Sequence, residues 1–503
     1  MSEGAGYLAV DLGAESGRVV LGRFDGERFA LEEVHRFPNV PVWAAGALYW
    51  DALRIFQEVK TGLARAGEAG GITSVAVDSW GVDFALLDGD GDLLSNPRNY
   101  RDPRTDGMME RAFGRVPREE IYRKTGIQFI QINTLYQLLA MQDSPLLETA
   151  DTLLLIPDLL NYWLTGEKVG ELTNATTTQL YDLESGDWAR DLARDMQLPD
   201  DIFPRIVPPA TRLGPLLPGV AEETGLAEGT AVAAAASHDT ASAVVAVPAE
   251  GEDFAYISSG TWSLVGVEAP RPVVTPEAMR SNFTNEGGFG GKTRFLKNVM
   301  GLWLLQECRR TWAREGRDYS YEELERLARE AAPFGPLVDP DHPSFFSPGE
   351  MPSRIRRFCE ATGQKTPEGP AEVARCVLES LALKYRLVVE QAGEITGQEV
   401  SVVHVVGGGV RNELLCRLTA DATRRPVRAE PAEATALGNL TVQAYAHGHL
   451  ASQEEIRAVV RRSVEVRDYE PRGGEDEWQE ALERLRAVTE EAPSQLDKGG
   501  ASA

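Results

Sequence analysis

Cysteine is scarce in this chain of 503 residues, which has only four cysteines. They are too few and too widely separated for a disulfide framework, and no two of them are spaced as a zinc-binding pair. The chain is therefore not a disulfide-stabilised domain or a zinc ribbon. The sequence leaves open whether two of them, Cys359 and Cys376, pair. The cysteines are Cys308, Cys359, Cys376 and Cys416.

Long apolar runs and an excess of basic residues are also absent. The most apolar stretch, residues 230–249, is interrupted by His238 and Asp239, and no basic segment followed by an apolar run opens the chain. We therefore expect no membrane span and no signal peptide. The 51 basic and 77 acidic residues give a net charge of −26, which disfavours nucleic acid and anionic membranes as partners. A cytoplasmic protein is expected, either a monomer or a homodimer.

The remaining composition is that of a globular protein, with 43% hydrophobic and 25% charged residues. The length allows two or more domains. Runs of apolar residues predict strands, and apolar spacing near 3.6 predicts helices. Their alternation indicates the α/β class. The predicted strands are 72–77, 84–87, 152–156 and 402–406, and the predicted helices are 51–64, 321–331, 370–392 and 432–446.

The chain contains one pattern twice, which suggests a duplicated architecture. Residues 7–24 are typical of a strand, a glycine-containing turn and a second strand, and residues 254–267 repeat this order in the second half. A connector rich in proline, glycine and acidic residues lies at 247–253. We predict an N-terminal domain over 1–247, a C-terminal domain over 248–490 and a flexible tail over 491–503.

The glycine turns are the candidate phosphate and nucleotide sites. The first turn carries Gly13, Ser16 and Arg18, and Asp11 beside it could hold Mg²⁺ through water. The second turn contains Gly260 and Thr261. The third, residues 407–409, is a triple glycine between a strand and a helix predicted over 412–423, and would let a flat ligand approach the backbone. The alternative for the first turn is a surface hairpin without a ligand.

Asp239 is the candidate reactive group because it lies among small residues at 233–243. A buried carboxylate is costly unless it is paired or functional. The alternative is that Asp239 caps the helix that follows it.

Three other segments resemble metal- or phosphate-binding motifs but lack residues that those motifs require. Residues 88–92 begin like a calcium loop, but Leu93 and Asn99 stand where that loop needs glycine and glutamate. Residues 291–293 end like a phosphate loop, but Glu286 stands at its first glycine. His447 and His449 are two isolated histidines and do not make a metal site by themselves.

Together these segments resemble the FGGY carbohydrate kinases over about residues 7–470. The resemblance implies an actin-like, ribonuclease H-like ATPase fold of two domains with an active-site cleft between them. It also implies transfer of a phosphoryl group from ATP, with Mg²⁺ near Asp11 and Asp239 as the catalytic proton acceptor. The segments that carry it are 11–18, 238–240, 259–262, 407–412 and 433–439.

Four further stretches resemble the family members that phosphorylate the 1-hydroxyl of L-rhamnulose. They are residues 77–88, 100–105, 282–288 and 294–310. The resemblance assigns Gly81, His238, Asp239, Thr240 and Asn298 to the sugar. It assigns Ala14, Glu15, Ser16, Gly17, Arg18, Thr261, Gln306 and Gly408 to the nucleotide.

Several alternatives stay open at this point. Glu15 departs from the family pattern, because an acid beside phosphates is unexpected. Gly81 could only make a turn, and Asn298 could only cap a helix. The substrate could be a related ketose such as L-fuculose or L-xylulose, or the chain could be a non-catalytic sugar-binding regulator.

Overall fold

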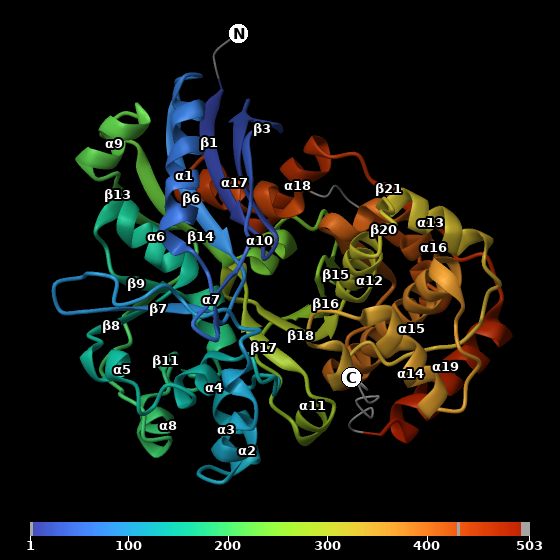
Figure 1. Ribbon diagram of the computed structural model, residues 1–503. Coiled ribbons are helices and arrows are strands. Elements are labelled where there is room, and N and C mark those ends of the chain that lie inside the picture. Colours follow the sequence, from blue (N-terminus) through green and yellow to red (C-terminus); the bar gives the residue numbers. More distant parts are fainter. Residues whose placement is uncertain (1–3, 430–432, 494–503) are drawn as a thin grey trace. The chain divides into compact units, whose positions relative to one another are not determined.

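A computed structural model of the chain describes residues 4–429 and 433–493 (Figure 1). They form two compact units, and each unit is made of several chain segments. Within the described residues, unit 1 contains 4–250, 268–296 and 433–464, and unit 2 contains 251–267, 297–429 and 465–493. The first crossing, after Glu250, lies inside the connector identified above, but the chain crosses between the units four more times. The functional division into 1–247 and 248–490 stays a prediction.

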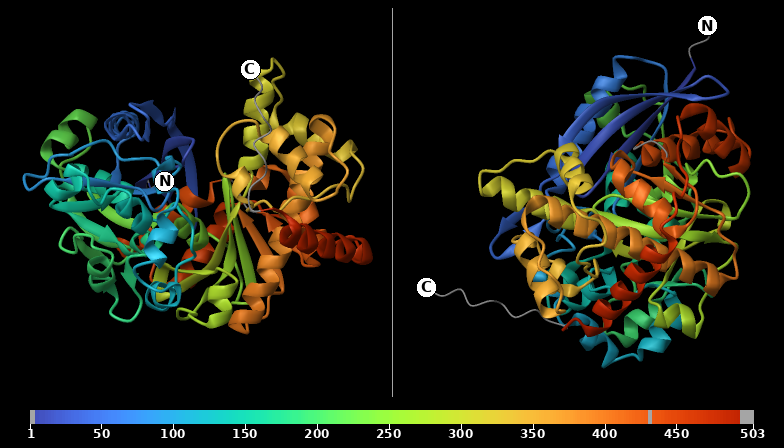
Figure 2. Two further views of the ribbon diagram at one scale, coloured as in Figure 1. Left: turned by 60° about the horizontal axis from the view of Figure 1, so that its bottom comes forward. Right: turned by 90° about the vertical axis from the view of Figure 1, so that its right-hand side faces the viewer.

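Unit 1 is built on a six-stranded sheet in the order β13-β14-β6-β1-β2-β3 (Figures 1 and 2). The central strands β1, β6 and β14 are parallel, and β2 and β13 run antiparallel to their neighbours β1 and β14. The strands are β1 (Ala5–Leu12), β2 (Ser16–Phe24), β3 (Phe29–Pro38), β6 (Ile72–Ser79), β13 (Thr211–Pro215) and β14 (Ala231–His238).

The second large sheet has seven strands in the order β17-β18-β16-β15-β19-β20-β21, with β17 (Thr284–Gly287) at one edge and β18 (Thr293–Met300) next to it. The part of this sheet from β16 to β21 repeats the arrangement of unit 1. Here β15, β19 and β20 are parallel, and β16 and β21 are the antiparallel neighbours. The same sequence of strand pairings thus occurs in both units, which confirms the duplication predicted from the two glycine turns. The strands are β15 (Phe254–Ser259), β16 (Trp262–Ala269), β19 (Val402–Val406), β20 (Val427–Ala429) and β21 (Arg467–Tyr469).

Short strand pairs and helices complete the two units. The strands of these pairs are β4 (Val42–Ala44), β5 (Ala47–Tyr49), β7 (Phe84–Leu87), β8 (Thr152–Leu155), β9 (Val169–Glu171), β10 (Tyr181–Asp182), β11 (Asp187–Trp188) and β12 (Arg205–Val207). Unit 1 holds the helices α1 (Ala52–Gly67), α2 (Met108–Phe113), α3 (Arg118–Thr125), α4 (Thr134–Leu139), α5 (Pro145–Thr149), α6 (Ile156–Thr165), α7 (Leu172–Ala175), α8 (Arg190–Asp195), α9 (Pro218–Thr224), α10 (Asp239–Val245), α11 (Pro276–Arg280), α17 (Ala434–Ala446) and α18 (Gln453–Ser463). Unit 2 holds α12 (Trp303–Arg314), α13 (Tyr321–Glu330), α14 (Met351–Ala361), α15 (Gly369–Thr396), α16 (Glu413–Thr423) and α19 (Glu475–Glu491).

The strands and helices predicted from the sequence are confirmed, with ends that differ by a few residues. The strand expected over 72–77 continues to Ser79, and the helix expected over 370–392 continues to Thr396. The predicted start of the helix over 432–446, and the tail beyond residue 493, lie outside the described residues. Residues 88–92 form a turn in which the Asp88 carboxylate accepts hydrogen bonds from two backbone N–H groups.

The structure also bears on the pairing of the cysteines and on the expected absence of a membrane span. All four cysteines are buried and free, including Cys359 and Cys376. In the part of the chain that is described, every helix is too short or too polar to cross a membrane.

Helix α17 returns to unit 1 from the far end of the chain and holds the centre of its sheet. Asn439 donates hydrogen bonds to the Ala76 carbonyl and to Asp78, and Gln443 donates one to the Leu8 carbonyl. The helix lies so close to α10 that a Cβ at Gly438 would come 1.8 Å from the Ser242 carbonyl oxygen. Backbone atoms of α10 cannot yield as a flexible side chain can, so the close approach requires glycine.

We therefore expect Gly438→Ala to lower the free energy of unfolding by about 1–3 kcal/mol, the usual cost of overpacking. Gly219→Ala is the matched control, because Gly219 is exposed in α9 and its Cβ would meet no atom within 4 Å. That change should raise stability by about 0.5–1 kcal/mol. Urea unfolding of both variants checks the pair, and equal stability of Gly438→Ala and the parent would refute the close-packing argument.

Candidate functional site

Three carboxylates lie at the carboxyl ends of the three parallel strands of unit 1. Asp11 on β1 is in register with Asp78 on β6, and Asp239 follows β14 directly. Burial and then the charge of Asp11 raise the pKa of Asp78 well above its ordinary value. One oxygen of Asp78 is buried without a hydrogen-bond partner among the described residues, whereas Asn439 donates to the other at 2.6 Å. Carboxylate oxygens are ligands that hard divalent cations prefer, although within the described residues no three His, Cys, Asp or Glu side chains are grouped so that they could hold a metal ion by themselves.

Arg18 partly neutralises this group from the neighbouring strand. Its Nε and Nη2 donate to the Asp11 carboxylate at 2.8 and 2.7 Å, and its Nη1 is paired with Glu433. Arg18, which was predicted to bind phosphate, is thus paired with Asp11 and Glu433 in this structure. Its role toward a nucleotide stays a prediction.

The turn between β1 and β2 presents the other predicted phosphate residues. Ala14, Glu15 and Ser16 are partly exposed at this turn, which the Gly13 N–H closes on the Ser16 carbonyl at 2.9 Å. Gly17 has a packing reason to be glycine, because a Cβ there would lie 2.3 Å from the Phe37 ring.

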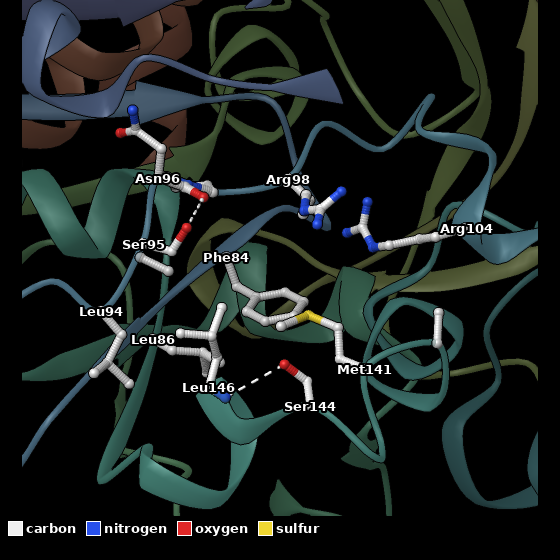
Figure 3. A pocket seen from close by; sticks show the side chains of 13 residues that line it. Phe84, Leu86, Leu94, Ser95, Asn96, Arg98, Arg104, Met141, Ser144 and Leu146 are labelled. Carbon is white, nitrogen blue, oxygen red and sulfur yellow. Dashed lines mark hydrogen bonds between the residues drawn. The ribbon is translucent and has the colours of Figure 1, made fainter. Parts of the chain in front are cut away.

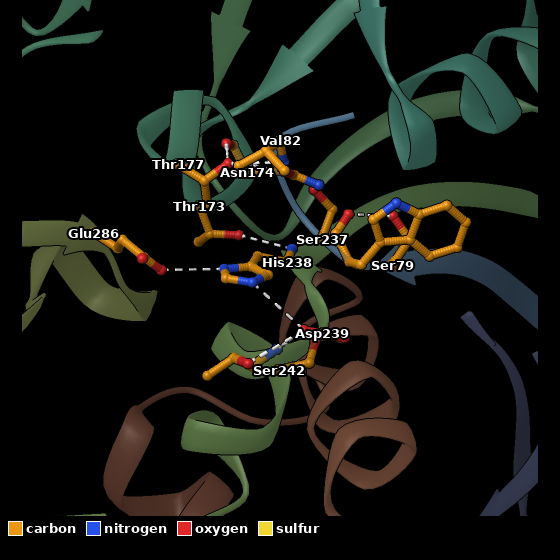
Figure 4. A network of polar contacts seen from close by, with 12 residues as sticks. Ser79, Val82, Thr173, Asn174, Thr177, Ser237, His238, Asp239, Ser242 and Glu286 are labelled. Atoms are coloured by element: carbon orange, nitrogen blue, oxygen red, sulfur yellow. Dashed lines mark hydrogen bonds and ion pairs between the residues drawn. The ribbon is translucent and has the colours of Figure 1, made fainter. Parts of the chain in front are cut away.

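His238 is the last residue of β14, and Asp239 is the first residue of α10 (Figure 4). The Nε2 of His238 lies 3.5 Å from the Asp239 carboxylate, which also accepts hydrogen bonds from the N–H and hydroxyl of Thr240. Asp239 keeps 30% of its side-chain surface accessible, while the dense protein around it raises its pKa by desolvation. The capping alternative is wrong, since His238 is the N-cap and Asp239 is the first residue of the helix.

Two residues that were not predicted as site residues hold His238 from the other side. The Nδ1 of His238 lies 3.2 Å from Glu286 and 3.2 Å from Arg294 (Figure 4 shows Glu286). Arg294 and Glu286 are themselves ion-paired at 3.0 Å and both are buried. Both belong to stretches that resemble the family, yet nothing in the sequence indicates that they contact His238.

Gly81 lies in a turn beside another buried carboxylate, that of Asp83. Asp83 accepts hydrogen bonds from the indoles of Trp50 and Trp80 at 2.6 and 3.0 Å. Burial raises the pKa of Asp83 to about 6. The Asp83 N–H bonds the Gly81 carbonyl, so Gly81 does make a turn, and a Cβ there would come 2.9 Å from the Thr177 hydroxyl. These contacts explain its small size, and its role toward a sugar stays a prediction.

A separate cavity of about 200 Å³ lies next to this region of unit 1 (Figure 3). Apolar side chains such as Phe84, Leu86 and Met141 line it, together with Arg98 and Arg104. It contains none of the predicted site residues.

In unit 2, the predicted nucleotide residue Thr261 contacts the start of α12, the helix that carries Gln306. The Thr261 carbonyl accepts hydrogen bonds from the N–H groups of Gly301 and Trp303, at the start of α12. Gln306 lies in the first turns of the same helix, and its side-chain oxygen is buried without a hydrogen-bond partner among the described residues. An orphaned buried acceptor of this kind is one that a ligand can satisfy.

The three adjacent glycines in the same unit differ in what they require. Gly407 has a φ of +83°, and a Cβ at Gly409 would lie 2.0 Å from the Ser259 hydroxyl, so both have local reasons to be glycine. A Cβ at Gly408 would meet no protein atom within 4 Å, and its φ is ordinary. Gly408 therefore has room beside it and no packing reason for being glycine.

Asn298 lies on β18 and is partly exposed. The alternative that it caps the next helix is wrong, because the N-cap of α12 is Leu302 and no side chain caps that end. The predicted site residues are thus distributed over both units. Gly81, His238, Asp239, Thr240 and the 14–18 turn belong to unit 1, and Asn298, Thr261, Gln306 and Gly408 belong to unit 2.

Comparison with known proteins matches both halves of the chain to one family. Residues 6–246 match the N-terminal domain of the FGGY family of carbohydrate kinases, and residues 255–447 match its C-terminal domain. A rhamnulokinase of Bacteroides thetaiotaomicron is 44% identical over 92% of this chain and 96% of that protein. A rhamnulokinase of Bacillus subtilis is 37% identical over 93% of this chain and 95% of that protein.

Solved structures agree on the fold. A xylulose kinase from Lactobacillus acidophilus superposes with a TM-score of 0.80 at 17% identity, over 97% of this chain and 98% of that one. A glycerol kinase of Plasmodium falciparum, solved with ADP, gives a TM-score of 0.76 at 15% identity, over 99% and 100% of the two chains. The predicted two-domain kinase fold is therefore confirmed.

The triple glycine leads to a prediction about nucleotide binding. Gly408→Val should weaken ATP binding at least tenfold, which corresponds to about 1.4 kcal/mol, because the branched side chain would fill the space beside the backbone. Since no protein atom lies near this Cβ, the melting temperature should hardly change. Calorimetric titration with ATP and thermal unfolding of the same sample check both points, and unchanged ATP affinity in the folded variant would disprove the assignment.

Proposed function

Because this chain belongs to the FGGY family of carbohydrate kinases, we propose that it transfers the γ-phosphoryl group of ATP to the 1-hydroxyl of L-rhamnulose. The products would be L-rhamnulose 1-phosphate and ADP. The observation that carries the choice of sugar is the 44% identity to a rhamnulokinase over 92% of the chain. The xylulose and glycerol kinases share the fold at 15–17% identity, which supports the reaction type but not their substrates.

In the proposed reaction, Asp239 accepts the proton of the sugar's 1-hydroxyl. The sugar oxygen forms a bond to the γ-phosphorus while the bond from that phosphorus to the bridging oxygen breaks, and ADP leaves with the electron pair. A carboxylate whose pKa is raised by burial is a stronger proton acceptor than an ordinary one. His238, held by Glu286 and Arg294, is placed to orient a sugar hydroxyl beside Asp239.

Mg²⁺ is the divalent ion that this proposal assigns to the nucleotide. Asp11 is our proposed ligand, with Asp78 beside it, because carboxylate oxygens and water are what this ion prefers. When bound with ATP, the ion supplies screening of the phosphate charge. The turn at residues 14–18 and the Thr261, Gln306 and Gly408 group would bind the phosphates and the adenosine. That the sugar and the nucleotide meet in a cleft between two domains stays a prediction, as does the cytoplasmic location.

A panel of ketoses tests the substrate directly. ADP release should be fast with L-rhamnulose, slower with L-fuculose and L-xylulose, and near background without sugar. Higher kcat/KM for another ketose would move the assignment to that sugar. No sugar-dependent release with any of them would favour a non-catalytic sugar-binding protein.

The role of Asp239 predicts a large loss of turnover on its replacement. Asp239→Asn keeps the size of the side chain but removes the proton acceptor, so kcat should fall by about 10²–10⁴-fold. A folded variant that keeps more than about a tenth of the turnover would exclude Asp239 as the base.

The same residue predicts the pH dependence of the reaction. Asp239 must be ionised to accept a proton, so kcat/KM should fall as the pH drops through its pKa. Burial raises that pKa, so the fall should begin above the ordinary aspartate value of about 3.9. Initial rates across the acid range, at pH values where the fold is intact, test the position of this limb.

Asn298 predicts a change in sugar binding. Loss of an amide hydrogen bond to a hydroxyl costs about 0.5–1.5 kcal/mol, so Asn298→Ala should raise the KM for L-rhamnulose several-fold. The affinity for ATP should be unchanged. An unaltered sugar KM together with a lower melting temperature would mean that Asn298 serves the fold and not the sugar.

A further inference from the structure

Strand β14 leaves the sheet just before the residues proposed to act on the sugar. Ala234 pairs with Val77 of β6, but the next pairing joins His238 to Ser79. Four steps along β14 therefore correspond to two steps along β6. The pairing with β13 on the other side also ends at Ala234. Backbone N–H groups beyond this point need other acceptors, because a buried N–H without a partner is costly.

The acceptors come from Glu171 and Thr173, which no sequence motif singled out. The Glu171 carboxylate accepts from the Ser237 N–H at 3.0 Å and from its hydroxyl at 2.7 Å. The His238 N–H donates to the Thr173 hydroxyl at 3.2 Å (Figure 4), and that hydroxyl donates to Glu171 at 2.6 Å. Two successive N–H groups ahead of Asp239 thus depend, directly or through Thr173, on one carboxylate oxygen.

Glu171 is a costly residue in this position. It is completely buried, and burial raises its pKa, while hydrogen bonds from Thr173 and Ser237 oppose that rise. The same oxygen accepts from the Asn174 N–H and so caps α7. Its own backbone N–H donates to Asp158, another fully buried acid, whose pKa burial and the charge of Glu171 raise well above the ordinary value. An apolar residue would avoid this cost but would leave the bulged backbone of β14 without acceptors.

We infer that Glu171 is a positioning residue that fixes His238 and Asp239 in place through Ser237 and Thr173. This inference rests on the proposed function, since it concerns the placement of the proposed proton acceptor. Misplacement of a reacting group by about 1 Å can lower a rate by about 10²-fold. Loss of Glu171 should therefore lower kcat more than it weakens ATP binding.

The experiment uses the full-length chain with Glu171→Gln, Thr173→Val and Thr173→Ser. Glu171→Gln keeps the shape but replaces the charged acceptor with a weaker one, and kcat with L-rhamnulose should fall about 10- to 100-fold. The KM for ATP should stay within twofold. Thr173→Val removes the hydroxyl that receives the His238 N–H and should lower kcat in the same range. Thr173→Ser restores a hydroxyl and should recover most of the rate.

Asp158→Asn is the matched control, because Asp158 is equally buried beside Glu171 but makes no hydrogen bond with residues 237–239. It should alter the melting temperature more than kcat. If Asp158→Asn lowered kcat as much as Glu171→Gln, the effect would be one of general stability and the inference would be overturned. If Glu171→Gln does not fold, the comparison of Thr173→Val with Thr173→Ser decides in its place.

Amide hydrogen exchange separates this inference from the proposed function. In folded Glu171→Gln or Thr173→Val, the peptide over residues 235–240 should exchange at least tenfold faster than in the parent, with other strands unchanged. This readout needs no sugar turnover. A parent enzyme inactive on L-rhamnulose would refute the proposed substrate, whereas unchanged exchange in these variants would refute the positioning role.

Discussion

Repulsion among three carboxylates governs the arrangement of unit 1. Asp11 and Asp78 lie near the carboxyl ends of β1 and β6, and Asp239 follows β14, so the sheet sets their positions and they cannot move apart. Each is stabilised by a different group: Arg18 pairs with Asp11, Asn439 donates to Asp78, and Thr240 donates to Asp239. Without Asn439 and Thr240, desolvation and like charge would raise the pKa of Asp78 and of Asp239 still further.

This constraint explains why the last part of the chain returns to the first unit. Glu433 and Asn439 lie about 400 residues after the side chains that they contact, Arg18 and Asp78. Helix α17 also brings Gly438 against α10, the helix that begins with Asp239. Closing such a long loop costs little more than closing a short one, because the entropic cost grows only with the logarithm of its length. The acidic edge is therefore supported by residues from both ends of the chain.

Local features of the fold could be predicted from the sequence, and long-range partners could not. The strands at 84–87 and 402–406 were predicted to the residue, because short apolar runs ending at polar residues or glycine are local signals. Asp239 was singled out from its small neighbours, and its catalytic role stays a prediction. Glu286, Arg294 and Glu171 were not, since nothing near them in the sequence indicates that they meet residues 237–238. The register shift in β14 was also invisible, because a run of alanines gives no alternation from which the pairing can be inferred.

The duplication gives the two units the same sheet and different chemistry. At the ends of β1, β6 and β14 stand Asp11, Asp78 and Asp239, whereas the corresponding strands β15 and β19 end at Ser259 and at the glycines after Val406. Acids at a strand edge can accept protons and attract a cation. Small residues at the same edge leave backbone exposed, where a flat or phosphorylated ligand can lie close to N–H groups. One supersecondary pattern thus carries carboxylates at the strand ends of unit 1 and small residues at those of unit 2, and the proposed reaction assigns proton transfer to the first edge and nucleotide binding to the second. The division follows from which side chains occupy equivalent strand ends, since the strand pairings themselves are the same in both units.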